Sequence, residues 1–137
     1  MPNWCTVRIY LKTNEWIDTN DLFRHIYDWK SYINEAKMTY DSGQYCYEVL
    51  CLTAWNIPMK FIEWCEEKGY DIKVAYYECG MGFYGVYEHG HRDEHTVTED
   101  DFKKTYIDPN DDDSVSYEPA GKLLEHVSKY GVYTDSF

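Results

Sequence analysis

The sequence predicts one domain of the α+β class, built on a single open sheet. Some stretches alternate apolar and polar residues, as half-buried strands do, and others repeat apolar residues every three or four positions, as amphipathic helices do. The length of 137 residues is that of a single domain. No Pro/Gly/Ser-rich linker divides the chain and no segment repeats, so we expect one hydrophobic core.

Residues 3–12 form the first predicted strand. From residue 5 onward its odd-numbered positions are apolar, while its even-numbered positions are polar or tyrosine, which indicates a strand with one buried face. The two sets are Cys5, Val7, Ile9 and Leu11 on one face, and Thr6, Arg8, Tyr10 and Lys12 on the other.

An amphipathic helix is predicted next, with its apolar side facing that strand. The apolar residues at helical spacing are Leu22, Ile26, Trp29 and Ile33. One of the residues 18–20, Asp-Thr-Asn, can cap the start of the helix by accepting from the free N–H groups of its first turn.

A hairpin, a second helix and a further strand follow. Residues 36–41 and 44–53 are extended segments around Gly43, which can take the positive φ of a tight turn. Pro58 suits the first turn of a helix, and Gly69 suits its end. The next strand is marked by the alternating residues Ile72, Val74 and Tyr76.

The order strand, helix, strand, strand, helix, strand is the split βαβ arrangement of a ferredoxin-like domain, with both helices on one sheet face. Residues 79–88 are rich in glycine and predict an extra strand with a turn and a bulge. We place the ferredoxin-like core in residues 1–90. Residues 91–137 are expected to form an acidic C-terminal extension packed on the same domain.

Three segments are predicted within this extension. A short helical piece lies near residues 98–106, and an acidic loop spans residues 108–114. A helix then runs from Pro119 to about Tyr130, with Gly131 as its stop.

The charge of the chain is strongly negative and unevenly placed. The net charge is −12, and residues 88–118 carry eleven acidic side chains against three basic ones. An acidic surface repels phosphate backbones and anionic membranes, so direct binding to nucleic acid or to a membrane is disfavoured. A protein with a basic surface is the favoured partner. The alternative is that the acidity only keeps the protein soluble.

The cysteines and the N-terminus indicate a cytoplasmic protein. The five cysteines are odd in number, form no CxxC spacing and mostly lie in apolar patterns, which is typical of free thiols in a reducing compartment. The N-terminus has no basic segment followed by a long apolar run. We therefore expect neither a signal peptide nor a membrane span.

Three motifs stand out in the first 90 residues. They are Met1-Pro2-Asn3-Trp4-Cys5, Thr53-Ala54-Trp55-Asn56-Ile57-Pro58 and Tyr77-Glu78-Cys79-Gly80-Met81-Gly82-Phe83-Tyr84-Gly85. Together they resemble the YubB-type ferredoxin-like domain family of phage and plasmid proteins, although Ile57 stands where that family often has proline. The resemblance implies the fold and a mobile-element origin, and it implies no catalytic residues.

No cluster in the sequence offers a complete set of metal ligands or catalytic groups. The spacing of His89, His91 and His95 matches no familiar zinc motif. The acidic loop lacks the glycine and the glutamate that a calcium-binding EF-hand loop needs at its sixth and twelfth positions. The glycines of residues 80–85 spell G-x-G-x-x-G, but a strand follows them, whereas phosphate binding needs a helix N-terminus. We predict no catalytic residues, no metal and no cofactor.

The leading hypothesis is a non-enzymatic phage or plasmid accessory protein that binds and inhibits a host protein in the bacterial cytoplasm, as anti-CRISPR and similar counter-defence inhibitors do. The partner would have a basic surface, such as that of a nucleic-acid-binding defence protein, in which carboxylates can take the place of phosphates. The candidate contact residues are Glu99, Asp100, Asp101, Asp108, Asp111, Asp112 and Asp113.

The alternative is a protein that binds or sequesters a small nucleotide-like ligand in an aromatic groove, because tyrosine and tryptophan rings can stack on a base. The groove candidates are Trp4, Trp55, Phe83 and Tyr84. This hypothesis ranks lower because phosphates need positive charge and the chain has few arginines, namely Arg8, Arg24 and Arg92. An uncharacterised enzyme ranks below both.

Overall fold

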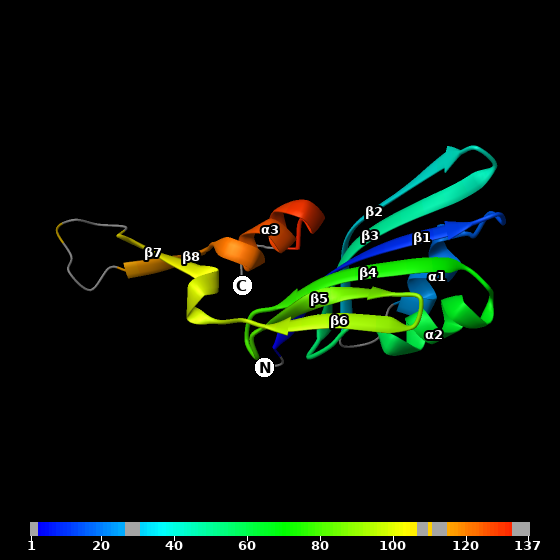
Figure 1. Ribbon diagram of the computed structural model, residues 1–137. Helices are drawn as coiled ribbons and strands as arrows, with labels where there is room; N and C mark the ends of the chain where they lie inside the picture. Colours follow the sequence, from blue (N-terminus) through cyan, green and yellow to red (C-terminus); the bar gives the residue numbers. More distant parts are fainter. Residues whose placement is uncertain (1–2, 27–30, 107–109, 111–114, 133–137) are drawn as a thin grey trace.

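The computed structural model of the protein describes residues 3–26, 31–106, 110 and 115–132. Within these residues the chain belongs to the α+β class, as predicted, with a six-stranded sheet, a separate two-stranded sheet and three α-helices (Figure 1). The larger sheet has the strand order β2-β3-β1-β4-β5-β6, and each strand is antiparallel to its neighbours.

The elements have the following bounds. The larger sheet consists of β1 (Trp4–Thr13), β2 (Ser31–Asp41), β3 (Gln44–Ala54), β4 (Asp71–Glu78), β5 (Phe83–Glu88) and β6 (His91–Thr96). The helices are α1 (Thr19–Ile26), α2 (Met59–Glu67) and α3 (Gly121–Tyr130), with a short 3-10 turn η1 (Glu99–Asp101). The smaller sheet consists of β7 (Phe102–Tyr106) and β8 (Val115–Pro119).

One face of the larger sheet packs against α1 and α2. The odd-numbered side chains of β1 from residue 5 onward are buried, as their alternation predicts. The apolar ones share one hydrophobic cluster with Leu22 of α1 and with Phe61 and Ile62 of α2. Because removing one large apolar side chain from water stabilises the fold by about 1.5–3 kcal/mol, this layer holds the main core.

The opposite face of the sheet is covered in part by α3. Tyr77 of β4 and Tyr84 of β5 form a second buried cluster with Leu123 and Val127 of α3. Figure 1 shows α3 on one side of the sheet and α1 and α2 on the other. The helix begins at Gly121 rather than at Pro119, which ends β8, and it stops before Gly131, as predicted, where the chain takes the left-handed conformation with a φ of 63°.

The first helix is shorter than predicted, because its last expected residue belongs to a strand. α1 ends at Ile26, and Ile33 lies in β2 opposite Cys51 of β3, while Trp29 is outside the described residues. β2 begins at Ser31 rather than at residue 36, since its pairing with β3 extends that far, with an irregularity between residues 33 and 35. Pairing between distant segments outweighed the helical spacing.

The predicted helical piece near residues 98–106 is wrong for the same reason. Its beginning forms only the short turn η1, and residues 102–106 are strand β7. This strand pairs with β8 from Phe102 opposite Pro119 to Tyr106 opposite Val115. The partner strand, which lies beyond the acidic segment, decides the conformation.

Strand β6 was not predicted, because its sequence His-Arg-Asp-Glu-His-Thr contains no apolar residue to mark an alternation. The turn before it has positive φ values of 52° at His89 and 76° at Gly90, which a tight hairpin turn of type I′ requires. The predicted strand over residues 79–88 is observed only as β5, and a turn occupies residues 79–82.

Gly85 of β5 leaves room for contacts between the strands on either side of it. A Cβ added there would overlap the Asp93 carbonyl oxygen and would lie 2.7 Å from the Tyr76 hydroxyl. We expect Gly85→Ala to lower the free energy of unfolding by about 2–3 kcal/mol, the usual cost of an overpacked site. Urea unfolding measures this change. A loss of less than about 0.5 kcal/mol, as for a neutral surface substitution, would show that β6 moves aside freely.

Candidate functional site

Strands β7 and β8 form an arm that leaves the larger sheet (Figure 1). We call residues 102–119, which include the segment joining the two strands, the acidic arm. Its base is the pair Phe102 and Pro119, and residues 107–114 join the other ends of the strands. From residue 99 to residue 118 the chain has eight acidic side chains and two lysines. The arm and its base therefore carry a large share of the negative charge.

Asp101 fixes the base of the acidic arm to α3. Its side chain is only 6% exposed, and its Oδ2 accepts from the Thr98 N–H at 2.9 Å. Its Oδ1 accepts from the Leu123 N–H in the first turn of α3 at 3.4 Å, and its carbonyl accepts from the Ala120 N–H at 2.7 Å. A carboxylate at a helix start satisfies N–H groups that the helix leaves free. Asp101 is thus a structural residue of the base rather than the exposed contact that we expected.

The other predicted acidic contacts fall in two places along the chain. Glu99 and Asp100 are exposed beside the base of the acidic arm. Asp108, Asp111, Asp112 and Asp113 lie outside the described residues, within the segment that joins β7 to β8. Two exposed charges of opposite sign, Lys103 and Glu118, lie opposite each other across the strands.

The four predicted groove residues do not share one face. The ring of Trp4 packs against Tyr32 at 5.2 Å between centroids, and Trp55 is 49% exposed in the turn before α2. Phe83 and Tyr84 follow each other in β5, so their side chains point to opposite faces of the sheet. Phe83 packs on Tyr76, whereas Tyr84 is buried against α3. Phe83 and Tyr84 therefore pack in two different layers, while Trp55 is exposed.

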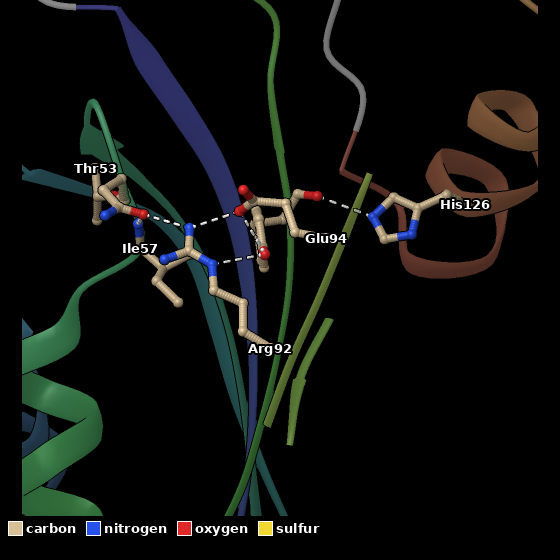
Figure 2. A network of polar contacts seen from close by, with 7 residues as sticks. Thr53, Ile57, Arg92, Glu94 and His126 are labelled. Atoms are coloured by element: carbon tan, nitrogen blue, oxygen red, sulfur yellow. Dashed lines mark hydrogen bonds and ion pairs between the residues drawn. The ribbon is translucent and has the colours of Figure 1, made fainter. Parts of the chain in front are cut away.

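A network of polar contacts links β4, β6 and the turn before α2 (Figure 2). The Arg92 Nε donates to the Tyr76 hydroxyl at 2.8 Å, and its Nη2 donates to Asn56 Oδ1 at 2.5 Å. The same Nη2 lies 2.9 Å from Glu94 Oε1, to which the Tyr76 hydroxyl also donates at 2.9 Å. The network gives Arg92 of β6 a structural role.

The Tyr76 hydroxyl, which lies between Arg92 and Glu94, is protonated near neutral pH. Burial raises the pKa of the Tyr76 hydroxyl, so it remains a donor to Glu94 near neutral pH. On the other side of β4, burial lowers the pKa of His126, whose Nε2 donates to the Tyr76 carbonyl at 2.9 Å. These contacts hold β4, β6 and α3 together.

The histidines between β5 and α3 do not converge. His89 lies in the turn before β6, while His91 and His95 lie in β6. The His95 ring sits 3.4 Å from an Asp93 carboxylate oxygen. Within the described parts of the chain, no group of three histidine, cysteine or acidic side chains is arranged to hold a metal ion.

The three sequence motifs meet at one end of the larger sheet. The Asn3 carbonyl of the first motif accepts from the Trp55 N–H of the second at 2.7 Å, and a Cβ at Gly80 of the third would lie within 2.5 Å of the Asn3 side chain. Glu78 is fully buried, and its carboxylate accepts from the N–H groups of Gly80 and Met81 at 2.6 and 2.7 Å. Sequence reasoning missed this buried carboxylate. The sequence feature that could have indicated it is Gly80, which marks a turn whose N–H groups need an acceptor.

All five cysteines are free, and they differ in accessibility. Burial raises the pKa of the Cys51 and Cys65 thiols to about 12, and it raises that of Cys5 as well. Cys79 is the exposed cysteine. Burial also raises the pKa of the Cys79 thiol, so access decides the order, and we expect iodoacetamide to modify Cys79 before the buried Cys5, Cys51 and Cys65. Mass spectrometry of the peptides checks this, and early modification of Cys5 or Cys51 in the folded protein would contradict it.

Together, the fold and the site define an α+β protein with a projecting acidic arm whose base is fixed to its C-terminal helix. Among the described helices, none has the length and apolar character needed to cross a membrane. No protein-family model, curated protein or solved structure matches the chain.

Proposed function

We propose that this is a non-enzymatic accessory protein of a phage or plasmid that binds a host protein with a basic surface and inhibits it. It acts in the cytoplasm of the bacterial host as a counter-defence inhibitor of the anti-CRISPR kind. The observation that carries the proposal is the placement of four aspartates in the segment that joins the two strands of the acidic arm, whose base is fixed by Asp101.

The fixed base lowers the entropic cost of binding through the acidic arm. Ordering a segment on association costs free energy, so an arm that is already paired along β7 and β8 and tied to α3 loses less. Its carboxylates can then engage lysine and arginine side chains in a groove that normally holds phosphates. Inhibition follows because the acidic arm and the nucleic acid compete for the same charges.

A ferredoxin-like core of the YubB type is part of the same proposal. Two features support it: the antiparallel strand order β2-β3-β1-β4, and the packing of α1 and α2 in one cluster against the same sheet face. A further supporting feature is that the three motifs contact one another around Asn3, so that a structural role accounts for their occurrence in one chain. The mobile-element setting of the proposal rests on this resemblance.

Affinity capture tests the proposal. The protein, tagged at its N-terminus so that the acidic arm stays accessible, is incubated with bacterial lysate in about 50 mM salt, where charge attraction is weakly screened. The expected result is one protein recovered in a stoichiometric amount. Salt elutes it, nuclease treatment of the lysate does not prevent its capture, and the purified protein binds nucleic acid. Recovery of no stoichiometric protein from lysates of several candidate hosts would contradict the proposal.

A further inference from the structure

A second charged feature lies on the sheet face that α3 covers in part, away from the acidic arm. Here the end of α3 and the strands β1, β4 and β5 line an open pocket of about 410 Å³, which we call the lysine pocket. Its walls are formed by Tyr10, Lys12, Asp71, Lys73, Glu88, Lys129 and Tyr130. Roughly 300–1,000 Å³ is the usual volume of a small-molecule site, so the lysine pocket can hold a ligand of that class.

The sheet register sets the order of the charges. Tyr10 of β1, Lys73 of β4 and Glu88 of β5 lie side by side in one row across the strands, and Lys12 lies opposite Asp71 in the next row. The last turn of α3 adds Lys129 and Tyr130 above them. Each strand therefore contributes its outward-facing residues to one wall.

The lysines of the pocket are available to a ligand. Within the described residues, none of the three forms an ion pair, although Lys12 and Lys73 each lie opposite a carboxylate residue on the neighbouring strand. The ammonium groups of Lys73 and Lys129 lie 5.4 and 5.2 Å from the centroid of one ring, that of Tyr130. Both ammonium groups therefore lie close to one ring in the wall of the pocket.

The sign of the charge here is opposite to that of the chain. The pocket has three lysines and two carboxylates, whereas the net charge of the protein is −12. Lysine ammonium groups are common ligands of phosphate. A long nucleic-acid strand would meet the surrounding negative charge and be repelled, but a small phosphorylated molecule that fits inside the cavity would not extend into it.

We propose that the lysine pocket binds a nucleoside phosphate. Lys73 and Lys129 contact its phosphate oxygens, and the ring of Tyr10, which meets Tyr130 in a T-shaped contact at 6.4 Å between centroids, provides the aromatic surface for the base. Asp71 and Glu88 accept hydrogen bonds from the ribose hydroxyls, as carboxylates do in dinucleotide sites. This site differs from the groove expected from the sequence, and its residues lie outside the acidic arm, so it is independent of the proposed inhibition.

Isothermal titration calorimetry with ADP tests the proposal, with pyrophosphate and adenosine as separate probes. ADP is expected to bind the unmodified protein in low salt, and pyrophosphate and adenosine are each expected to bind at least about tenfold more weakly, since each offers only part of the contacts. Pyrophosphate binding as tight as ADP would overturn the nucleoside assignment in favour of a simple phosphate site. No heat of binding with any probe at millimolar concentration would overturn the site itself.

Charge-matched variants locate the binding. Lys73→Gln/Lys129→Gln removes two positive charges from the pocket and is expected to weaken ADP binding by about tenfold or more. Lys60→Gln/Lys68→Gln removes two exposed charges at α2 on the other sheet face and should leave ADP affinity unchanged. Equal weakening in both variants would show that ADP responds only to net charge and would contradict the proposal. Thermal unfolding of both variants confirms that they are folded.

Discussion

Replacing Asp111, Asp112 and Asp113 together with asparagine is expected to slow association with the captured partner by about tenfold or more at low salt. Long-range attraction raises the encounter rate more than it holds the final complex, so the association rate should change before the dissociation rate does. The dependence of the rate on salt should also become flatter. Stopped-flow or surface-based kinetics at several salt concentrations measure both effects.

A matched control separates the position of the charges from their number. Glu35→Gln/Glu63→Gln/Glu67→Gln also removes three exposed negative charges, but from β2 and α2 rather than from the acidic arm. This variant should keep most of the association rate. Both triple variants should fold, because exposed charges contribute little to stability. An unchanged rate in the aspartate variant, with loss of binding on replacement of Trp4 or Trp55, would move the contact onto the motif end of the sheet.

The second large effect is expected for Glu78→Ala, which should lower the free energy of unfolding by about 2–4 kcal/mol. The fully buried carboxylate accepts from two backbone N–H groups, and a hydrogen bond to a carboxylate contributes about 1.5–3 kcal/mol to stability. Chemical denaturation followed by tryptophan fluorescence measures the loss. Because the turn of residues 79–82 depends on these contacts, the variant should also loosen the junction of the three motifs.

Glu78→Gln provides the control for this prediction. Its amide oxygen keeps one acceptor and its amide nitrogen replaces the other, so about half of the loss is expected. Equal stability of the alanine variant and the original protein would show that water satisfies the two N–H groups, and the proposed structural role of Glu78 would then be wrong.

The elements that the sequence predicts well are those with a buried face. β1 was predicted within a residue because four apolar residues alternate along it, and α3 because Leu123, Val127 and Gly131 mark its apolar side and its end. β6 was missed because it is polar, and β7 was predicted as part of a helical piece, since only pairing with their partner strands makes these segments extended. The end of α1 was misplaced because Ile33 satisfies helical spacing and strand burial equally well.

The candidate site was less accessible to sequence reasoning. Negative charge near residues 99–113 can be counted, but whether a carboxylate is exposed, as for Asp100, or buried as a cap, as for Asp101, depends on the contact with α3. The lysine pocket could not be predicted from the sequence for a similar reason. Its residues are far apart in the sequence, and only the sheet register and the last turn of α3 bring Lys12, Lys73 and Lys129 to one cavity.

The central claim is that the acidic arm occupies a basic, nucleic-acid-binding surface of a host protein. The most direct measurement is fluorescence anisotropy of the captured partner bound to its labelled nucleic acid, titrated with this protein. The account predicts full displacement of the nucleic acid at one equivalent, and it predicts that the Asp111→Asn/Asp112→Asn/Asp113→Asn variant needs about tenfold more protein. A stable ternary complex, in which the nucleic acid stays bound while this protein binds as well, would contradict it.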